Sequence, residues 1–207
     1  NEPWRELSWG QKQNDLQYVQ QYKPEKDDIR YLRILLYGPV GAGKSSFINT
    51  VSNVLRGRMT IPALASATTS DKNRGVYADD IKLALRGHVK EDHKVQQLHE
   101  QMKSSVLEKM KSVREAASDL GIPQMAMMTH IDEACSETEK DLRTVYKSKY
   151  LKKKMKDFSS AVEIPMNCIF PVKNYSEEID MNDDIDALIL SALRNMINFG
   201  DDFIEKI

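Results

Sequence analysis

Three short apolar runs along the chain predict β-strands. Ile34 to Tyr37 is strand-like and ends at a glycine-rich loop, and the continuous run Met125 to Met128 is typical of a strand buried on both faces. A third strand is expected over Asn167 to Phe170 with Val172. Helical patterns separate the runs, so the sequence predicts an α/β fold with a mostly parallel sheet covered on both faces.

Helices are expected where apolar residues recur at every third or fourth position. Gly121, followed by Pro123, predicts the C-cap of one long helix. Ser136 and Glu139 have the spacing of a capping box and predict the start of another. The expected helices cover 79–89, 98–120, a segment with the apolar stripe Leu151, Met155 and Phe158, and 183–197.

The first 30 residues are polar and differ from the rest of the chain. Trp4 and Trp9 are followed by Leu16, Val19 and Tyr22 at helical intervals. We therefore expect an N-terminal arm over 1–30 with a short amphipathic helix, and one domain over 31–207.

Composition excludes several functional classes. The 207 residues carry a net charge of -1, so no global basic field is available to gather nucleic acid. Cys135 and Cys168 are too few for a disulfide scaffold and are expected to be reduced thiols of a cytosolic protein. No apolar run approaches the roughly 20 residues that a membrane span needs.

The glycine-rich loop matches the phosphate-binding pattern G-x-x-x-x-G-K-[ST] between a predicted strand and a predicted helix. Its backbone N–H groups are expected to converge on a β-phosphate at the positive end of the helix. Lys44 would bridge the β- and γ-phosphates, and the Ser45 hydroxyl would bind Mg²⁺. The predicted phosphate-binding residues are Gly38, Val40, Gly41, Ala42, Gly43, Lys44, Ser45 and Ser46.

Two later loops carry residues suited to a nucleotide base. Thr129-His130-Ile-Asp132 follows the second predicted strand and fits the guanine-reading pattern N/T-K-x-D, with His in place of Lys. The Asp carboxylate would accept from guanine N1–H and the exocyclic amine, donors that adenine lacks; Asp132 could otherwise be a turn or helix-cap residue. His130 would lay its ring against the purine. Lys173 and Asn174, after the last strand, would complete the pocket.

The catalytic parts of a GTPase are less evident. Thr68 or Thr69 fits a switch threonine, and we take Thr69 with Ser45 as the predicted Mg²⁺ ligands. No D-x-x-G preceded by an apolar strand occurs in the sequence, and no water-orienting Gln or Arg can be assigned. Catalytic residues therefore stay unassigned.

With its loops in this order, the chain resembles the guanine-nucleotide-binding portion of the interferon-induced protein 44 family, including its 44-like members, and looks most like a fish form. The resemblance implies a P-loop GTPase-like three-layer fold in a cytoplasmic, interferon-induced, antiviral protein that binds GTP and GDP. Longer members carry an N-terminal TLDc-type domain. The resemblance rests on the Pro3-to-Leu7 arm, "LLYGPVGAGKSSFINTV", "DDIKLALRGHV", "THID", "FPVKNYSEEID" and "DDIDALILSALRNM".

We interpret the chain as a module that binds GTP and GDP with Mg²⁺ and hydrolyses GTP slowly at most. It would act as a switch or assembly module with protein partners, which include a second copy of the chain. One rival is an ATP-dependent P-loop enzyme, in which Asp132 would be incidental. The other is a scaffold with a vestigial nucleotide pocket.

The stretch between Ser46 and Met125 lacks the apolar strands that a Ras-like sheet would place there. Without them, the first strand and the Met125 strand would have no neighbours to complete their hydrogen-bond ladders. We therefore predict that the sequence is closed over two absent segments, one near Lys72–Asn73 and one near Lys94–Val95. Continuous bonding at both positions, with Cα atoms about 3.8 Å apart, would contradict this prediction.

Overall fold

The computed structural model of the protein describes residues 2–62, 85 and 104–207. Helices and strands are mixed in it, as the sequence predicts. In chain order the described elements are η1 (Trp9–Gln11), α1 (Lys12–Gln21), α2 (Lys44–Arg56), α4 (Ser104–Asp119), β1 (Ala126–Met128), α5 (Ile131–Ala134), α6 (Ser136–Lys140), η2 (Leu142–Thr144), α7 (Lys149–Val162), η3 (Met166–Cys168), β2 (Ile169–Pro171) and α8 (Asp183–Ile204).

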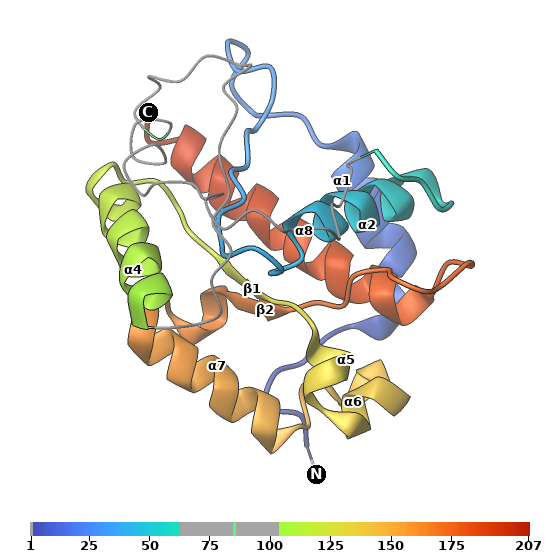
Figure 1. Ribbon diagram of the computed structural model, residues 1–207. Helices are drawn as coiled ribbons and strands as arrows, with labels where there is room; N and C mark the ends of the chain where they lie inside the picture. The colour runs from blue at the N-terminus through green and yellow to red at the C-terminus, as the bar shows by residue number, and fades with distance from the viewer. Residues whose placement is uncertain (1, 63–84, 86–103) are drawn as a thin grey trace.

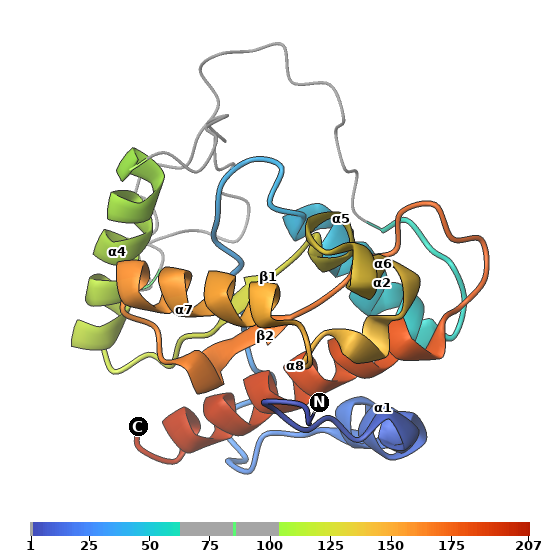
Figure 2. The same ribbon diagram turned by 90° about the horizontal axis from the view of Figure 1, so that it is seen from below.

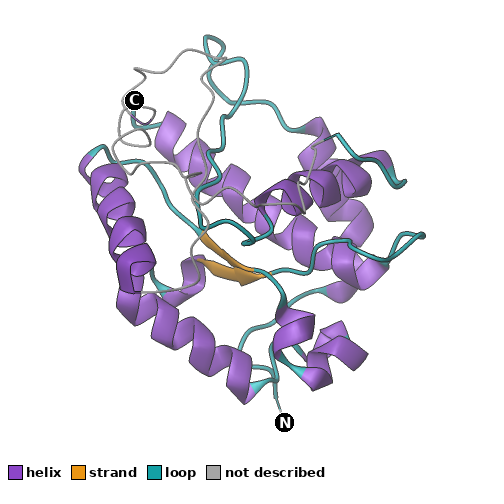
Figure 3. Cartoon of the chain, viewed as in Figure 1, coloured by secondary structure: helices purple, strands orange, loops and turns teal. Residues whose placement is uncertain are grey.

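A small parallel sheet lies at the centre of the described chain (Figure 3). β1 pairs with β2 so that Met127 lies opposite Phe170. Successive side chains of a strand point to opposite faces. Ile169 accordingly packs with α7, whereas Phe170 packs with α2 and α8. Alternation along β2 therefore joins two hydrophobic cores, one on each face of the sheet.

Helices cover both faces of this sheet (Figures 1 and 2). α4 and α7 lie on one face and α2 and α8 on the other, with α1 packed on the outer side of α8. α8 is the predicted closing helix, extended to Ile204. Its N-cap residue Asn182 accepts hydrogen bonds from the Asp184 and Ile185 amides through its side chain. The small parallel sheet between helices is compatible with the predicted α/β class.

The strand predicted at Ile34 to Tyr37 is wrong for the described chain, where this segment forms no β-ladder. Leu36 packs against the core, but Ile34 and Leu35 are 49% and 51% exposed. A strand needs a neighbouring backbone to satisfy its N–H and C=O groups, and β1 and β2 pair with each other. Apolar sequence alone therefore does not make this segment a strand.

Three further features of the strands and helices differ from the sequence predictions. Asn167 and Cys168 form the turn η3, so the last strand begins at Ile169. β1 is half-buried and not buried on both faces as predicted, and among the described residues β2 is the one strand that pairs with it. The predicted capping box at Ser136 is wrong, since Cys135 occupies the N-cap position and no side chain caps α6.

The helix end predicted at Gly121 is confirmed. Gly121 ends α4 with φ +68°, and its N–H donates to Ser118 O over 2.9 Å, as expected for a C-cap glycine. Cys135 and Cys168 are free thiols. None of the helices within the described ranges has the length and apolar character needed to cross a bilayer. The helix predicted at 79–89, the start of the 98–120 helix, and Thr68 and Thr69 lie outside the described residues.

Candidate nucleotide-binding site

The glycine-rich loop leads directly into α2. Gly41 and Gly43 have φ values of +81° and +78°, a backbone conformation that glycine adopts readily. Gly43 is the N-cap residue, and no side chain accepts from the first-turn amides of α2. Ser45 and Ser46 belong to this first turn. The positive end of α2, with uncapped N–H groups, is therefore available to an anion.

The Lys44 side chain is held by carbonyl groups of the glycine-rich loop that precedes it. Its ammonium donates to Gly38 O over 2.9 Å and to Pro39 O over 2.7 Å. Burial lowers the pKa of this ammonium, because it is partly removed from water. Within the described chain, both of these acceptors are neutral carbonyls, so no carboxylate neutralises the ammonium in these contacts. An anion at the loop would meet an uncompensated cation.

The loop after β1 contacts the glycine-rich loop. Thr129 Oγ1 donates to Ala42 O over 3.1 Å, and the His130 ring lies between Gly41 O, 3.3 Å from Nε2, and Glu133 Oε1, 2.8 Å from Nδ1. The hydrogen bond to Glu133 raises the pKa of His130. Both partners of the ring are acceptors, so only the imidazolium donates to both at once. His130 therefore bridges the loop after β1 and the glycine-rich loop.

The loop after β2 closes on the same place. Asn174 Nδ2 donates to Gly43 O over 3.2 Å, and a Cβ added at Gly43 would lie only 2.7 Å from that nitrogen. Glycine is thus required here for close approach as well as for its positive φ. The Asn174 Oδ1 atom is buried and has no hydrogen-bond partner within the described chain. A buried acceptor without a donor is rare and suits a ligand donor.

Asp132 lies in the first turn of α5 and faces Lys173. Its Oδ2 atom is 3.3 Å from Lys173 Nζ, and the same ammonium is 2.7 Å from Glu178 Oε1. Partial burial opposes the charged form of Lys173, but its hydrogen bonds to Glu178 and Asp132 outweigh this and raise the pKa. The carboxylate predicted to bind guanine is therefore already paired with Lys173. Lys173 itself has a closer ion-pair partner, Glu178.

The structure brings most of the predicted site residues together. The glycine-rich loop, the Thr129–His130 pair and Asn174 are in direct contact, and the Asp132–Lys173 pair spans the two later loops. Thr69 lies outside the described residues. Sequence reasoning missed Glu133 and Glu178, whose only signal is their closeness in sequence to His130 and Lys173.

The glycine-rich loop, the uncapped start of α2 and the two later loops together form the candidate nucleotide-binding site. No protein-family model matches the chain, and no solved structure matches it at a significant level. The chain is homologous to interferon-induced protein 44: it is 26% identical to the protein of Mus musculus over 94% of this chain, and 25% identical to that of Homo sapiens over 93%. Interferon-induced protein 44-like of Homo sapiens is 26% identical over 91% of the chain.

The chain spans 60% of the mouse relative and 57% and 56% of the two human relatives. The alignment to the mouse protein is 255 positions long but includes 94% of these 207 residues, or about 195, which leaves about 60 positions without a residue of this chain. The absent internal segments and the fish origin both stay predictions.

The two predicted junctions, Lys72–Asn73 and Lys94–Val95, lie outside the described residues, so they need a chemical test. We expect that protein isolated from its native cells yields no peptide that runs continuously through both junctions. Digestion with a protease that cleaves after acidic residues leaves the lysines intact, and mass spectrometry then reads the sequence on each side. Continuous peptides through both junctions, in the same sample that covers the glycine-rich loop, would contradict the prediction.

Proposed function

We propose that this chain is a guanine-nucleotide-binding module that takes GTP and GDP with Mg²⁺. The observation that carries the proposal is the convergence of three loops, in which Thr129, His130 and Asn174 contact the carbonyls of Gly41, Ala42 and Gly43. The names of the relatives support an interferon-induced protein. We therefore propose that it works as a switch or assembly module of the innate antiviral response in the cytoplasm.

The phosphates bind at the N-terminus of α2. Amide groups of the first turn donate to the β-phosphate, and the macrodipole of the 13-residue helix favours its negative charge. Lys44 exchanges its contacts with Gly38 O and Pro39 O for phosphate oxygens, which are charged and therefore stronger acceptors. Ser45 supplies a hydroxyl suited to Mg²⁺, and Thr69 is the proposed second protein ligand.

The base binds between the two later loops. Asp132 accepts from the guanine N1–H and amine, and the buried Asn174 Oδ1, which has no partner in the described chain, offers another acceptor. Lys173 does not block this step, because its closer contact is with Glu178. When guanine engages Asp132, Lys173 keeps that 2.7 Å contact and its charge remains compensated.

A scaffold with a vestigial pocket is the second candidate, and the half-exposed Ile34 and Leu35 favour it. In a complete P-loop fold these residues would belong to a paired strand, and here they do not. This candidate requires no nucleotide and predicts that the chain acts through protein partners alone. An ATP-dependent enzyme is less favoured, because a carboxylate at position 132 suits the N–H donors of guanine and would meet none on adenine.

Thermal unfolding with and without nucleotide tests the proposal. A ligand that binds the folded state stabilises it by about 2.7 kcal/mol at a concentration one hundred times its Kd. We expect GDP or GTP with Mg²⁺ to raise the unfolding temperature, and ATP at the same concentration to leave it unchanged. The scaffold predicts no shift with any nucleotide, and equal shifts with ATP and GTP would support the ATP-dependent enzyme.

A further inference from the structure

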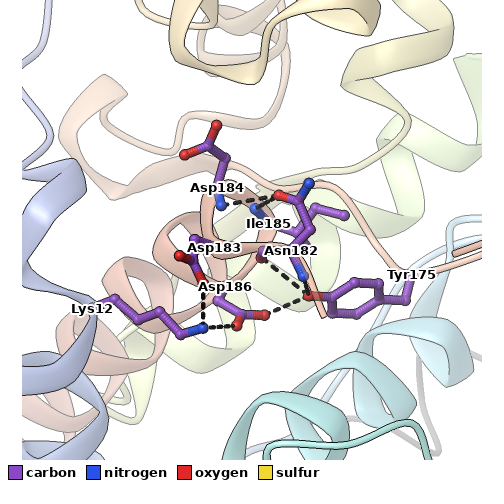
Figure 4. A network of polar contacts seen from close by, with 7 residues as sticks. All are labelled: Lys12, Tyr175, Asn182, Asp183, Asp184, Ile185 and Asp186. Carbon is purple, nitrogen blue, oxygen red and sulfur yellow. Dashed lines mark hydrogen bonds and ion pairs between the residues drawn. The ribbon is translucent and has the colours of Figure 1, made fainter. Parts of the chain in front are cut away.

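A buried carboxylate on α8 is neutralised by the N-terminal arm (Figure 4). Asp186 is 1% exposed, and its Oδ2 atom makes an ion-pair contact of 2.6 Å with Lys12 Nζ on α1. Lys12 also lies 2.7 Å from Asp183 Oδ1. Burial opposes the charged form of Lys12, but its contacts with Asp183 and Asp186 outweigh this and raise the pKa. A buried carboxylate is strongly disfavoured without such a partner.

The other oxygen of Asp186 binds the loop that follows β2. Asp186 Oδ1 accepts from the Tyr175 hydroxyl over 2.6 Å, and that hydroxyl also accepts from the Asn182 amide over 2.7 Å. Burial, and then the hydrogen bond to Asp186, raises the pKa of Tyr175. Tyr175 therefore stays protonated as a donor, and its ring is fixed at the N-terminus of α8 (Figure 4).

Tyr175 also connects this network to the phosphate-binding helix. Its backbone N–H donates to Thr50 Oγ1 over 3.0 Å, and Thr50, fully buried in α2, donates to Ser46 O over 2.8 Å. The preceding residue, Asn174, donates to Gly43 O. A continuous series of polar contacts therefore runs from Lys12 in the arm to the first turn of α2.

We propose that Lys12 is a positioning residue for the nucleotide site. By compensating the charge of Asp186 it fixes Tyr175, and through Tyr175 it holds Asn174 against the glycine-rich loop. This inference rests on the proposed function. Without Lys12, Asp186 takes up a proton or turns toward water, and either change weakens its hydrogen bond with Tyr175. The N-terminal arm then supports the nucleotide site without contacting it directly.

The coupling works in both directions, because binding free energies are reciprocal. Any partner that draws α1 away from α8 lowers nucleotide affinity, and bound nucleotide holds α1 more firmly on α8. The arm also has contacts with α8 that bypass Asp186. Arg194 Nη1 lies 2.9 Å from Asp15 Oδ1, and Tyr18 OH donates to Asn198 Oδ1 over 2.8 Å. These contacts offer a matched control within the same interface.

The test compares Lys12→Met with Arg194→Met, which removes the same charge from the same interface without touching Asp186. Hydrogen–deuterium exchange of a peptide containing Tyr175 is measured without nucleotide, and GDP affinity is measured with Mg²⁺. We expect Lys12→Met to speed this exchange and to weaken GDP binding, each by about tenfold. We expect Arg194→Met to change both by less than about twofold, and Lys12→Arg to restore both.

Unchanged exchange and unchanged GDP affinity in folded Lys12→Met would overturn the proposal, as would equal effects of Arg194→Met. If the unmodified protein binds no nucleotide, the proposed function fails, but the exchange measurement still decides whether Lys12 positions the loop. Should Lys12→Met not fold, Tyr175→Phe replaces it: the ring is kept, the hydroxyl is lost, and the same increase in exchange is expected. Exchange at residue 175 as slow as in the unmodified protein would contradict the proposed coupling from Lys12 through Asp186 to Tyr175.

Discussion

Replacing Lys44 by Ala is expected to reduce GTP affinity roughly a hundredfold, since hydrogen bonds to charged groups contribute about 1.5–3 kcal/mol each. Lys44 is the only side-chain cation in the loop Gly38–Ser45. Its ammonium is already located at the loop through Gly38 O and Pro39 O, so truncation removes a positioned charge. Titration calorimetry with GTP and Mg²⁺ measures the loss.

The matched control for this change is Arg56→Ala, which removes a cation from the last turn of the same helix. We expect it to leave GTP affinity within about twofold, because the site lies at the opposite end of α2. Circular dichroism shows whether each variant is folded. Undiminished GTP binding by folded Lys44→Ala would rule out the phosphate-loop interpretation.

Replacing Asp132 by Asn is expected to exchange the preference for guanine with one for xanthine. An amide offers a donor where xanthine presents an oxygen, whereas guanine loses the acceptor for its two N–H groups. We expect GDP affinity to fall by roughly tenfold to a hundredfold and xanthosine diphosphate to bind more tightly than GDP. Competition between the two nucleotides for a fluorescent analogue measures the change.

Lys173 makes this a sharper experiment than the sequence alone suggests. Asp132→Asn also removes an ion-pair partner of Lys173, but Glu178 remains 2.7 Å from that ammonium. A general loss of local structure would weaken both nucleotides equally. Glu137→Gln, an exposed change on neighbouring α6, is the control and should alter neither affinity. Weakened binding of GDP without any gain for the xanthine nucleotide would count against Asp132 as the guanine reader.

Local signals predicted the end of α4 and the start of α8, because caps and apolar periodicity are encoded within a few residues, but they missed the start of α6 and the extension of α8 to Ile204. Gly121 ends α4 as its sequence context indicates, and α8 follows the apolar periodicity of 183–197. The strand at Ile34 to Tyr37 failed for the opposite reason. A β-ladder depends on a neighbouring backbone that is distant in sequence, and no apolar pattern reports whether that neighbour is present.

In the candidate site, too, local motifs were predictable from the sequence and long-range contacts were not. The glycine-rich loop and the two later loops were predicted from short motifs, and the structure brings Thr129, His130 and Asn174 against that loop. The contact of Lys12 with Asp186 joins residues 174 positions apart and leaves no local pattern in the sequence. Buried polar partners of this kind can be recognised only once the fold has placed them.

If the chain proves continuous through Lys72–Asn73 and Lys94–Val95, it has no γ-phosphate sensor of the D-x-x-G type. The scaffold then becomes the preferred function, because a nucleotide switch must distinguish GTP from GDP. The presence of additional segments would instead supply strands to pair with Ile34 to Tyr37. The half-exposed side chains of Ile34 and Leu35 would then be covered.

Titration calorimetry of the unmodified protein with GTP, GDP and ATP, each in the presence of Mg²⁺, tests the central claim most directly. We predict saturable binding of GTP and GDP at one site and no detectable binding of ATP at the same concentrations. Omission of Mg²⁺ should weaken GTP binding if Ser45 holds the metal. Equal binding of ATP and GTP, or the absence of binding by all three nucleotides, would contradict the account.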